Sequence, residues 1–215
     1  MKETKIRLES GSLFSSGVLL EPANPRSFGV ILGHGAGGNM NAPFMNFFHR
    51  GIADAGYPCL KFNFFYSEAR KKAPDPQHLL ISCFEKAIEA MPVDKVLIGG
   101  KSMGGRIASY VAAHQKVAGL IFLGYPLHPP GKMDQLRDQH LYSIGKPMLF
   151  ASGTKDPFAR LDLLNQTIEK IGIHATRFLV ENGGHSFEVP KKNSRPQAEI
   201  LNDVLHEILR FTEGI

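Results

Sequence analysis

The chain has 215 residues, of which 43% are hydrophobic and 21% are charged, and its formal net charge is +5. This length lies within the range of one α/β domain and is sufficient for a sizeable core. The basic clusters at residues 70–72 and 191–192 are too short to indicate nucleic-acid binding. No apolar stretch approaches the ~20 residues that span a bilayer. We therefore expect a single soluble, cytoplasmic domain over residues 1–215, without a nucleic-acid or membrane partner.

Strand-like and helix-like segments alternate along the chain. Two short segments flank a Gly-Ser turn and predict an antiparallel pair at residues 6–8 and 17–20. Further strands are predicted at residues 28–32, 57–65, 95–98, 117–123, 147–151 and 176–180. Helical spacing of apolar residues predicts helices within 44–52, 80–91, 107–112, 161–171 and 201–211. This alternation predicts a mostly parallel sheet of about eight strands, with helices on both faces.

The segment from residue 125 to 145 separates two of the predicted strands. At about twenty residues, it has room for a loop and one helix around residues 133–144. It is too short for a lid domain, so we expect an open site.

The most informative motif is Gly-Gly-Lys-Ser-Met-Gly-Gly at residues 99–105, between a predicted strand and a predicted helix. A serine in so sharp a turn has positive φ and an exposed hydroxyl, and the turn requires small residues two positions before and after it. Gly100 and Gly104 meet this requirement around Ser102. The motif predicts that Ser102 is a nucleophile. The alternative is a glycine-rich turn with a bystander serine.

Two further residues follow predicted strands at the edge where ligands bind in open α/β sheets. Asp156 stands in Gly-Thr-Lys-Asp-Pro, and His185 stands in Asn-Gly-Gly-His-Ser-Phe. A serine hydroxyl needs an imidazole to accept its proton, and that imidazole needs a carboxylate to orient it. The chain order Ser, Asp, His is that of the α/β-hydrolase triad. We expect His185 to act as base and then acid, and Asp156 to orient it. Asp156 could instead cap a helix before Pro157, and His185 could be a loop histidine bonded by backbone.

The reaction also needs hydrogen-bond donors for an oxyanion. The first candidate is the N–H of Met103, at the start of the predicted helix. The second comes from the glycine-rich loop after the strand at residues 28–32, with Ala36 as the first choice and Gly37 as the fallback. His34 begins this loop, and we expect its ring to bond the loop rather than to react.

The substrate pocket is less well defined by the sequence. Phe65, Tyr66, Tyr125 and Leu127 are candidate wall residues because they follow strands at the site face. Basic side chains in loops on that side are candidates to favour an anionic substrate: residues 70–72, Lys132 and residues 191–192. The alternative is ordinary solvated charge.

Three other features are left open or excluded. Lys101 either tunes the site or points into packing, and Arg106 could pair with Glu68. The cysteines, Cys59 and Cys83, are expected to be buried free thiols, because neither has the spacing of metal ligands. The chain's histidines lack such spacing as well, so we expect no metal and no cofactor.

These motifs together resemble the α/β-hydrolase superfamily over nearly the whole chain. More narrowly, the chain is similar to small hydrolases labelled dienelactone-hydrolase-like, a group related to a non-catalytic subunit of a histone acetyltransferase complex. The stretches that carry this resemblance are residues 34–38, 62–69, 73–75, 99–106, 123–132 and 153–158. Dienelactone hydrolase proper has a cysteine nucleophile where this chain has Ser102, so its lactone substrate does not carry over. The narrower group has a proline where this chain has Phe65.

The expected function is therefore a serine hydrolase that cleaves a small ester through an acyl-Ser102 intermediate. A hydrolase-like scaffold that binds a partner or small ligand is the alternative, because fold alone does not establish activity. Acyl transfer to an acceptor other than water would use the same residues.

Overall fold

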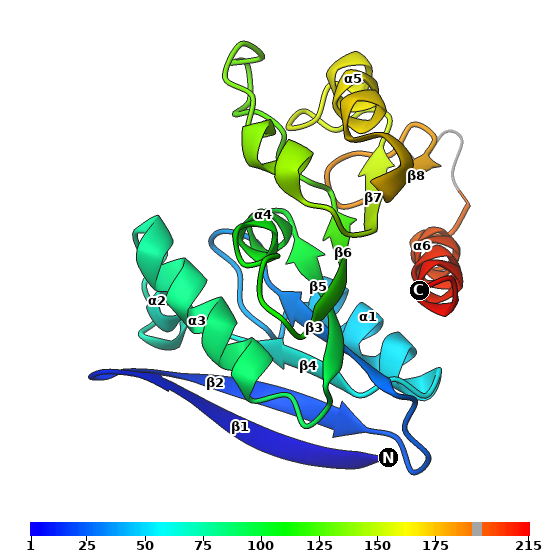
Figure 1. Cartoon of the computed structure of the whole chain (residues 1–215). Helices are drawn as coiled ribbons and strands as arrows, with labels where there is room; N and C mark the ends of the chain where they lie inside the picture. Colours follow the sequence, from blue (N-terminus) through cyan, green and yellow to red (C-terminus); the bar gives the residue numbers. More distant parts are fainter. Residues whose placement is uncertain (191–194) are drawn as a thin grey trace.

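The computed structural model describes residues 1–190 and 195–215, and within them eight strands form one mixed sheet in the order β1-β2-β4-β3-β5-β6-β7-β8 (Figure 1). The strands are β1 (Lys2–Ser10), β2 (Leu13–Glu21), β3 (Phe28–Gly33), β4 (Cys59–Phe62), β5 (Lys95–Lys101), β6 (Val117–Leu123), β7 (Met148–Gly153) and β8 (Ala175–Val180). β2 pairs antiparallel with β1 and with β4, and all other neighbours are parallel. The predicted parallel sheet with an antiparallel edge is confirmed.

Helices cover both faces of the sheet (Figure 1). They are α1 (Pro43–Asp54), α2 (Phe65–Glu68), α3 (Gln77–Glu89), α4 (Met103–Tyr110), α5 (Leu161–Ile171) and α6 (Gln197–Glu213), with short 3-10 helices η1 (Gln139–Ser143) and η2 (Gly172–His174). The apolar sides of α3, α4 and α5 share one core cluster, and those of α1 and α6 share the other. The central strands are buried on both sides, which explains their continuous apolar runs. None of the described helices is both long and apolar enough to span a membrane.

Two predicted elements differ from the structure. The strand predicted at residues 57–65 ends at Phe62, because the next backbone groups bond elsewhere: Asn63 N–H donates to Ser16 O, and Phe64 N–H donates to the His34 ring. The helix predicted around residues 133–144 is only the 3-10 helix η1. The residues before it form a loop that is closed by a backbone hydrogen bond, in which Arg137 N–H donates to Leu127 O at 2.8 Å.

Candidate active site

Ser102 lies in the one-residue turn between β5 and α4 and has φ 49° and ψ −113°. Neighbouring backbone leaves no room for side chains at two positions that flank this turn, one in β5 and one in α4. A Cβ on Gly100 would lie 2.0 Å from Gly33 O, and one on Gly104 would lie 2.1 Å from the same oxygen. The Ser102 N–H donates to Leu123 O at 3.0 Å. The chain therefore builds the strand–turn–helix context that the sequence motif predicts.

Asp156 and His185 meet beside this turn, from the loops after β7 and β8. His185 Nδ1 lies 2.8 and 2.9 Å from the two carboxylate oxygens of Asp156, so the ring donates to that carboxylate. The Asp156 side chain is fully buried, whereas that of His185 is 18% exposed. Asp156 Oδ1 also accepts from Phe158 N–H at 2.8 Å. The Asp156 carboxylate therefore holds both the backbone of its own turn and the ring of His185 in place.

Ser102 and His185 line the same cavity, whose volume is about 390 Å³. Its other lining residues are His34, Gly35, Ala36, Gly38, Asn39, Ala42, Phe44, Met45, Lys101, Phe158 and Ser186. The Phe158 ring packs against the His185 ring with centroids 4.4 Å apart. Among the described residues no hydrogen bond joins the Ser102 hydroxyl to His185. Such bonds often tighten only when substrate is present.

A second cavity of about 260 Å³ lies on another side of Ser102. It is lined by Ala36, Pro74, Asp75, Gln77, Leu80, Ser102, Met103, Arg106, Pro126, Arg137 and Phe158. No sequence signal indicates Arg137 as a site residue. Its position depends on the irregular loop before η1, for which the sequence has no periodic signal.

The loop after β3 is held by His34, as the sequence predicts. His34 Nδ1 donates to Gly35 O at 2.8 Å, and its Nε2 accepts from Phe64 N–H at 3.2 Å. Burial lowers the pKa of His34 to about 4, so the ring is neutral in this role. Gly37 N–H donates to the Tyr66 hydroxyl at 3.3 Å, whereas Ala36 lines both cavities next to Ser102. Of the two residues, Ala36 is therefore the one that lies beside Ser102.

The Lys101 side chain is buried against the loop that carries His185 rather than exposed to solvent. Its Nζ donates to His185 O at 2.7 Å and lies 5.7 Å from the centre of the Phe44 ring. Burial lowers the pKa of Lys101 to about 8, although Asp156 and Glu188 oppose this shift. Lys101 therefore anchors the backbone of the loop that carries His185.

The four residues predicted as pocket walls do not line either cavity beside Ser102. Phe65, Tyr66, Tyr125 and Leu127 are all buried in the core. Phe65 and Tyr66 belong to α2 rather than to a strand end, and the Tyr125 hydroxyl donates to Arg137 O at 2.7 Å. The walls come instead mainly from the loop after β3, from the first turns of α1, α3 and α4, and from the loops that carry Asp75, Arg137 and Phe158.

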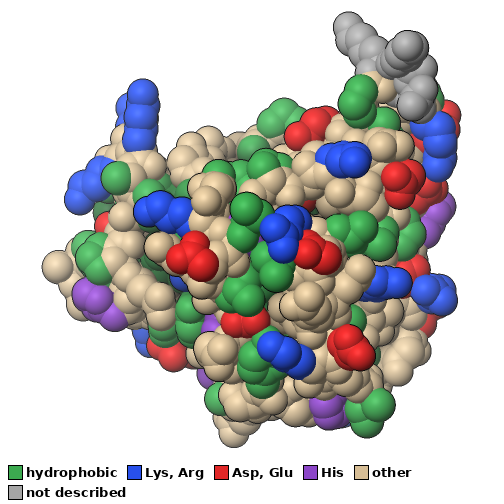
Figure 2. Space-filling model, turned by 90° about the horizontal axis from the view of Figure 1, so that it is seen from above, with side chains coloured by type: hydrophobic (Ala, Val, Ile, Leu, Met, Phe, Trp, Pro, Cys, Tyr) green, Lys and Arg blue, Asp and Glu red, His purple; other side chains and the backbone are tan. Residues whose placement is uncertain are grey.

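The basic loop residues also lie away from the cavities. Residues 70–72 and Lys132 are exposed and line neither of them, and residues 191–192 lie outside the described part of the chain. Glu68 accepts from Ser16 and Asn63, rather than pairing with Arg106. On the face seen in Figure 2, positive and negative side chains are interspersed with apolar ones. Cys59 and Cys83 are buried free thiols, as predicted.

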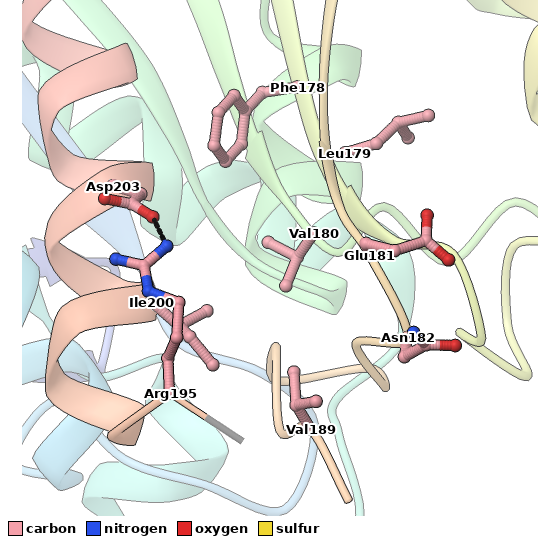
Figure 3. Close-up of a pocket in the computed structure, with 9 residues that line it drawn as sticks. All are labelled: Phe178, Leu179, Val180, Glu181, Asn182, Val189, Arg195, Ile200 and Asp203. Atoms are coloured by element: carbon pink, nitrogen blue, oxygen red, sulfur yellow. Dashed lines mark hydrogen bonds and ion pairs between the residues drawn. The ribbon is translucent and has the colours of Figure 1, made fainter. Parts of the chain in front are cut away.

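A further cavity, of about 370 Å³, lies between β8 and the start of α6 (Figure 3). Figure 3 shows apolar side chains of both elements facing it, beside the ion pair of Arg195 and Asp203 at 2.6 Å. Neither Ser102 nor His185 lines it.

Comparison with known proteins identifies the family of the chain. Residues 26–213 match the model of the α/β hydrolase domain family. The chain belongs to this family. Family membership supports hydrolase activity.

Solved structures with the same fold match almost the full length of this hydrolase. The dienelactone hydrolase of Anabaena variabilis is 20% identical, with a TM-score of 0.78 and coverage of 99% of this chain and 97% of that one. An alpha-beta serine hydrolase homologue from Coxiella burnetii is 17% identical, with a TM-score of 0.76 and coverage of 98% and 97%. XC6422 from Xanthomonas campestris, described as a serine hydrolase without lid, is 16% identical, with a TM-score of 0.75 and coverage of 99% and 94%. At these identities the likeness shows the fold alone.

Proposed function

We propose that this α/β hydrolase is a serine esterase of small substrates, with Ser102 as nucleophile, His185 as general base and acid, and Asp156 as the residue that orients His185. One observation carries the proposal. Ser102, in a strained turn with positive φ, opens onto the same cavity as His185, whose Nδ1 bonds the buried Asp156 carboxylate. This arrangement leaves His185 Nε2 as the ring nitrogen available to the serine.

The reaction follows from these positions. Ser102 Oγ attacks the ester carbonyl carbon while His185 takes its proton, and Asp156 stabilises the resulting imidazolium. The oxyanion accepts hydrogen bonds from the N–H groups of Met103 and Ala36, and the dipole of α4 adds to their effect. His185 then protonates the leaving alcohol, and a water molecule activated by the same ring releases the acid from Ser102.

The substrate class follows from the size and openness of the site. The cavities beside Ser102 measure about 390 and 260 Å³, which suits a small ester. The segment between β6 and β7 contains only the short helix η1, so it does not form a lid domain. A lipase that needs interfacial activation is therefore disfavoured.

The test is hydrolysis of 4-nitrophenyl acetate and butyrate by the wild type and by Ser102→Ala, His185→Ala and Ser143→Ala. Ser143 lies on η1 and is exposed, so its variant is the matched control. We expect activity in the wild type and in Ser143→Ala, and losses of about 10⁴-fold or more in the other two. Equal residual activity in all four proteins would reject Ser102 as nucleophile. A folded wild type without activity on any ester would favour the scaffold alternative.

A further inference from the structure

The second cavity beside Ser102 carries two cationic side chains on its wall. Arg106 and Arg137 are both half-buried. Arg106 lies one helical turn after Ser102 on α4, and Arg137 lies in the loop before η1. The only polar contact of the Arg137 guanidinium within the described residues is a 3.5 Å hydrogen bond to Pro126 O. Neither arginine has a carboxylate oxygen within 4.0 Å in the described part of the chain.

These guanidinium groups lie close enough to affect each other. The pKa of Arg137 is lowered from its ordinary value, first by burial and then by the positive charge of Arg106. The charge of Arg106 also helps burial to lower the pKa of His140. Asp75 lines the same cavity but forms no ion pair with either arginine among the described residues. One carboxylate against two guanidinium groups leaves the cavity net positive, so an anion would be favoured there.

The position of His185 decides which half of an ester would enter this cavity. His185 lines only the larger cavity, whose walls include Ala42, Phe44 and Met45. Because His185 must protonate the leaving oxygen, the alcohol half has to lie on that apolar side. The acyl half then extends past Met103 toward the arginines.

We propose that the acyl half of the substrate ends in a second, ionised carboxylate, which Arg106 and Arg137 bind. The substrates are monoesters of short dicarboxylic acids with apolar alcohols. This inference rests on the proposed function. Ser102 Oγ adds to the ester carbonyl carbon, the ester C–O bond then breaks as the carbonyl re-forms, and the serine proton leaves with the alcohol. Water then supplies OH to the acyl carbon and returns a proton to Ser102, so that the products are the alcohol and the dicarboxylic acid.

The probe pair that tests this inference is 4-methylumbelliferyl hydrogen adipate and 4-methylumbelliferyl hexanoate. They share the leaving group and the acyl chain length, and they differ only in a terminal carboxylate or methyl group. We expect the wild type to show a kcat/KM at least about 10-fold higher for the adipate ester. Arg106→Gln and Arg137→Gln should each lower that value by about 10- to 100-fold, the range of one charge-assisted hydrogen bond. In both variants the ratio of kcat/KM for the adipate ester to kcat/KM for the hexanoate ester should fall by a similar factor. Arg70→Gln, at an exposed position outside the cavity, is the control and should change neither rate.

A wild type that prefers the hexanoate ester, or variants that lose both activities equally, would overturn the inference. Calorimetric titration with free adipate separates this failure from failure of the proposed function. If neither ester is cleaved but adipate binds the wild type and not Arg137→Gln, the anion site stands and the esterase assignment fails. If adipate does not bind the wild type at all, the anion site is rejected. Arg137→Lys should recover part of the binding, because it restores the charge without the planar fork.

Discussion

Gly104→Ala tests whether close packing of α4 against β3 positions the proposed nucleophile. The new Cβ would lie 2.1 Å from Gly33 O, 2.4 Å from Gly33 C and 2.9 Å from His34 O, whereas ordinary contacts begin at 3.4 Å. All three obstacles are backbone atoms, so no side chain can rotate away. The start of α4 must therefore move by about 1 Å, and it carries Ser102 and the Met103 N–H with it.

We expect this substitution to cost about 3 kcal/mol of unfolding free energy, at the upper end of the usual overpacking range. For a chain of this size that corresponds to a fall in Tm of about 10 °C. A displacement of this size also predicts a loss in kcat/KM of about 100-fold. The assays are thermal unfolding and ester hydrolysis at a temperature where the variant remains folded. Gly145→Ala is the matched control, because a Cβ there meets no atom within 4 Å. A Gly104→Ala protein with wild-type Tm and activity would refute the reasoning.

Three further predictions concern ionisable groups. Asp156→Asn should lower kcat by about 10⁴-fold, because the amide no longer holds the required His185 tautomer. The free energy of unfolding, measured by chemical denaturation, should change little. Burial lowers the pKa of Lys101 from its ordinary 10.5 to about 8 in the folded protein, so between these pH values the unfolded chain binds more protons. The free energy of unfolding of the wild type should therefore rise by about 3 kcal/mol from pH 8 to pH 10.5 relative to Lys101→Met. Parallel pH profiles of unfolding free energy for the two proteins would contradict this. Burial lowers the pKa of His49 from 6.5 to about 4, so the unfolded chain binds a proton first as the pH falls. The free energy of unfolding should therefore decrease by about 3 kcal/mol from pH 6.5 to pH 4. In urea unfolding, His49→Gln should show a smaller decrease over the same pH range.

The sequence predicted the parts of this molecule that depend on local pattern. The buried strands have continuous apolar runs, and the turn at Ser102 needs Gly100 and Gly104 for reasons that apply to any chain with this geometry. The loops after β7 and β8 are adjacent because parallel strands end at one edge of the sheet, so the meeting of Asp156 and His185 followed from topology.

The pocket walls depend on contacts that no local pattern encodes. The sequence pattern predicts a strand end at Phe65, but Phe64 N–H donates to the His34 ring, so β4 ends earlier and the chain continues into α2. Arg137 reaches the site only because its loop folds back onto Leu127. Such long-range pairings decide which side chains face a cavity. The residue types of Phe65 and Arg137 do not predict these pairings.

Labelling with a fluorophosphonate probe, followed by mass-spectrometric mapping of the modified peptide, tests the central claim most directly. We expect one phosphonylated residue, Ser102, in the wild type. We expect unchanged labelling in Ser186→Ala, although that residue is the other serine on the same cavity. Labelling should be lost in Ser102→Ala and strongly slowed in His185→Ala. Absence of labelling in folded wild type, or modification of another residue, would contradict the claim that His185 activates Ser102.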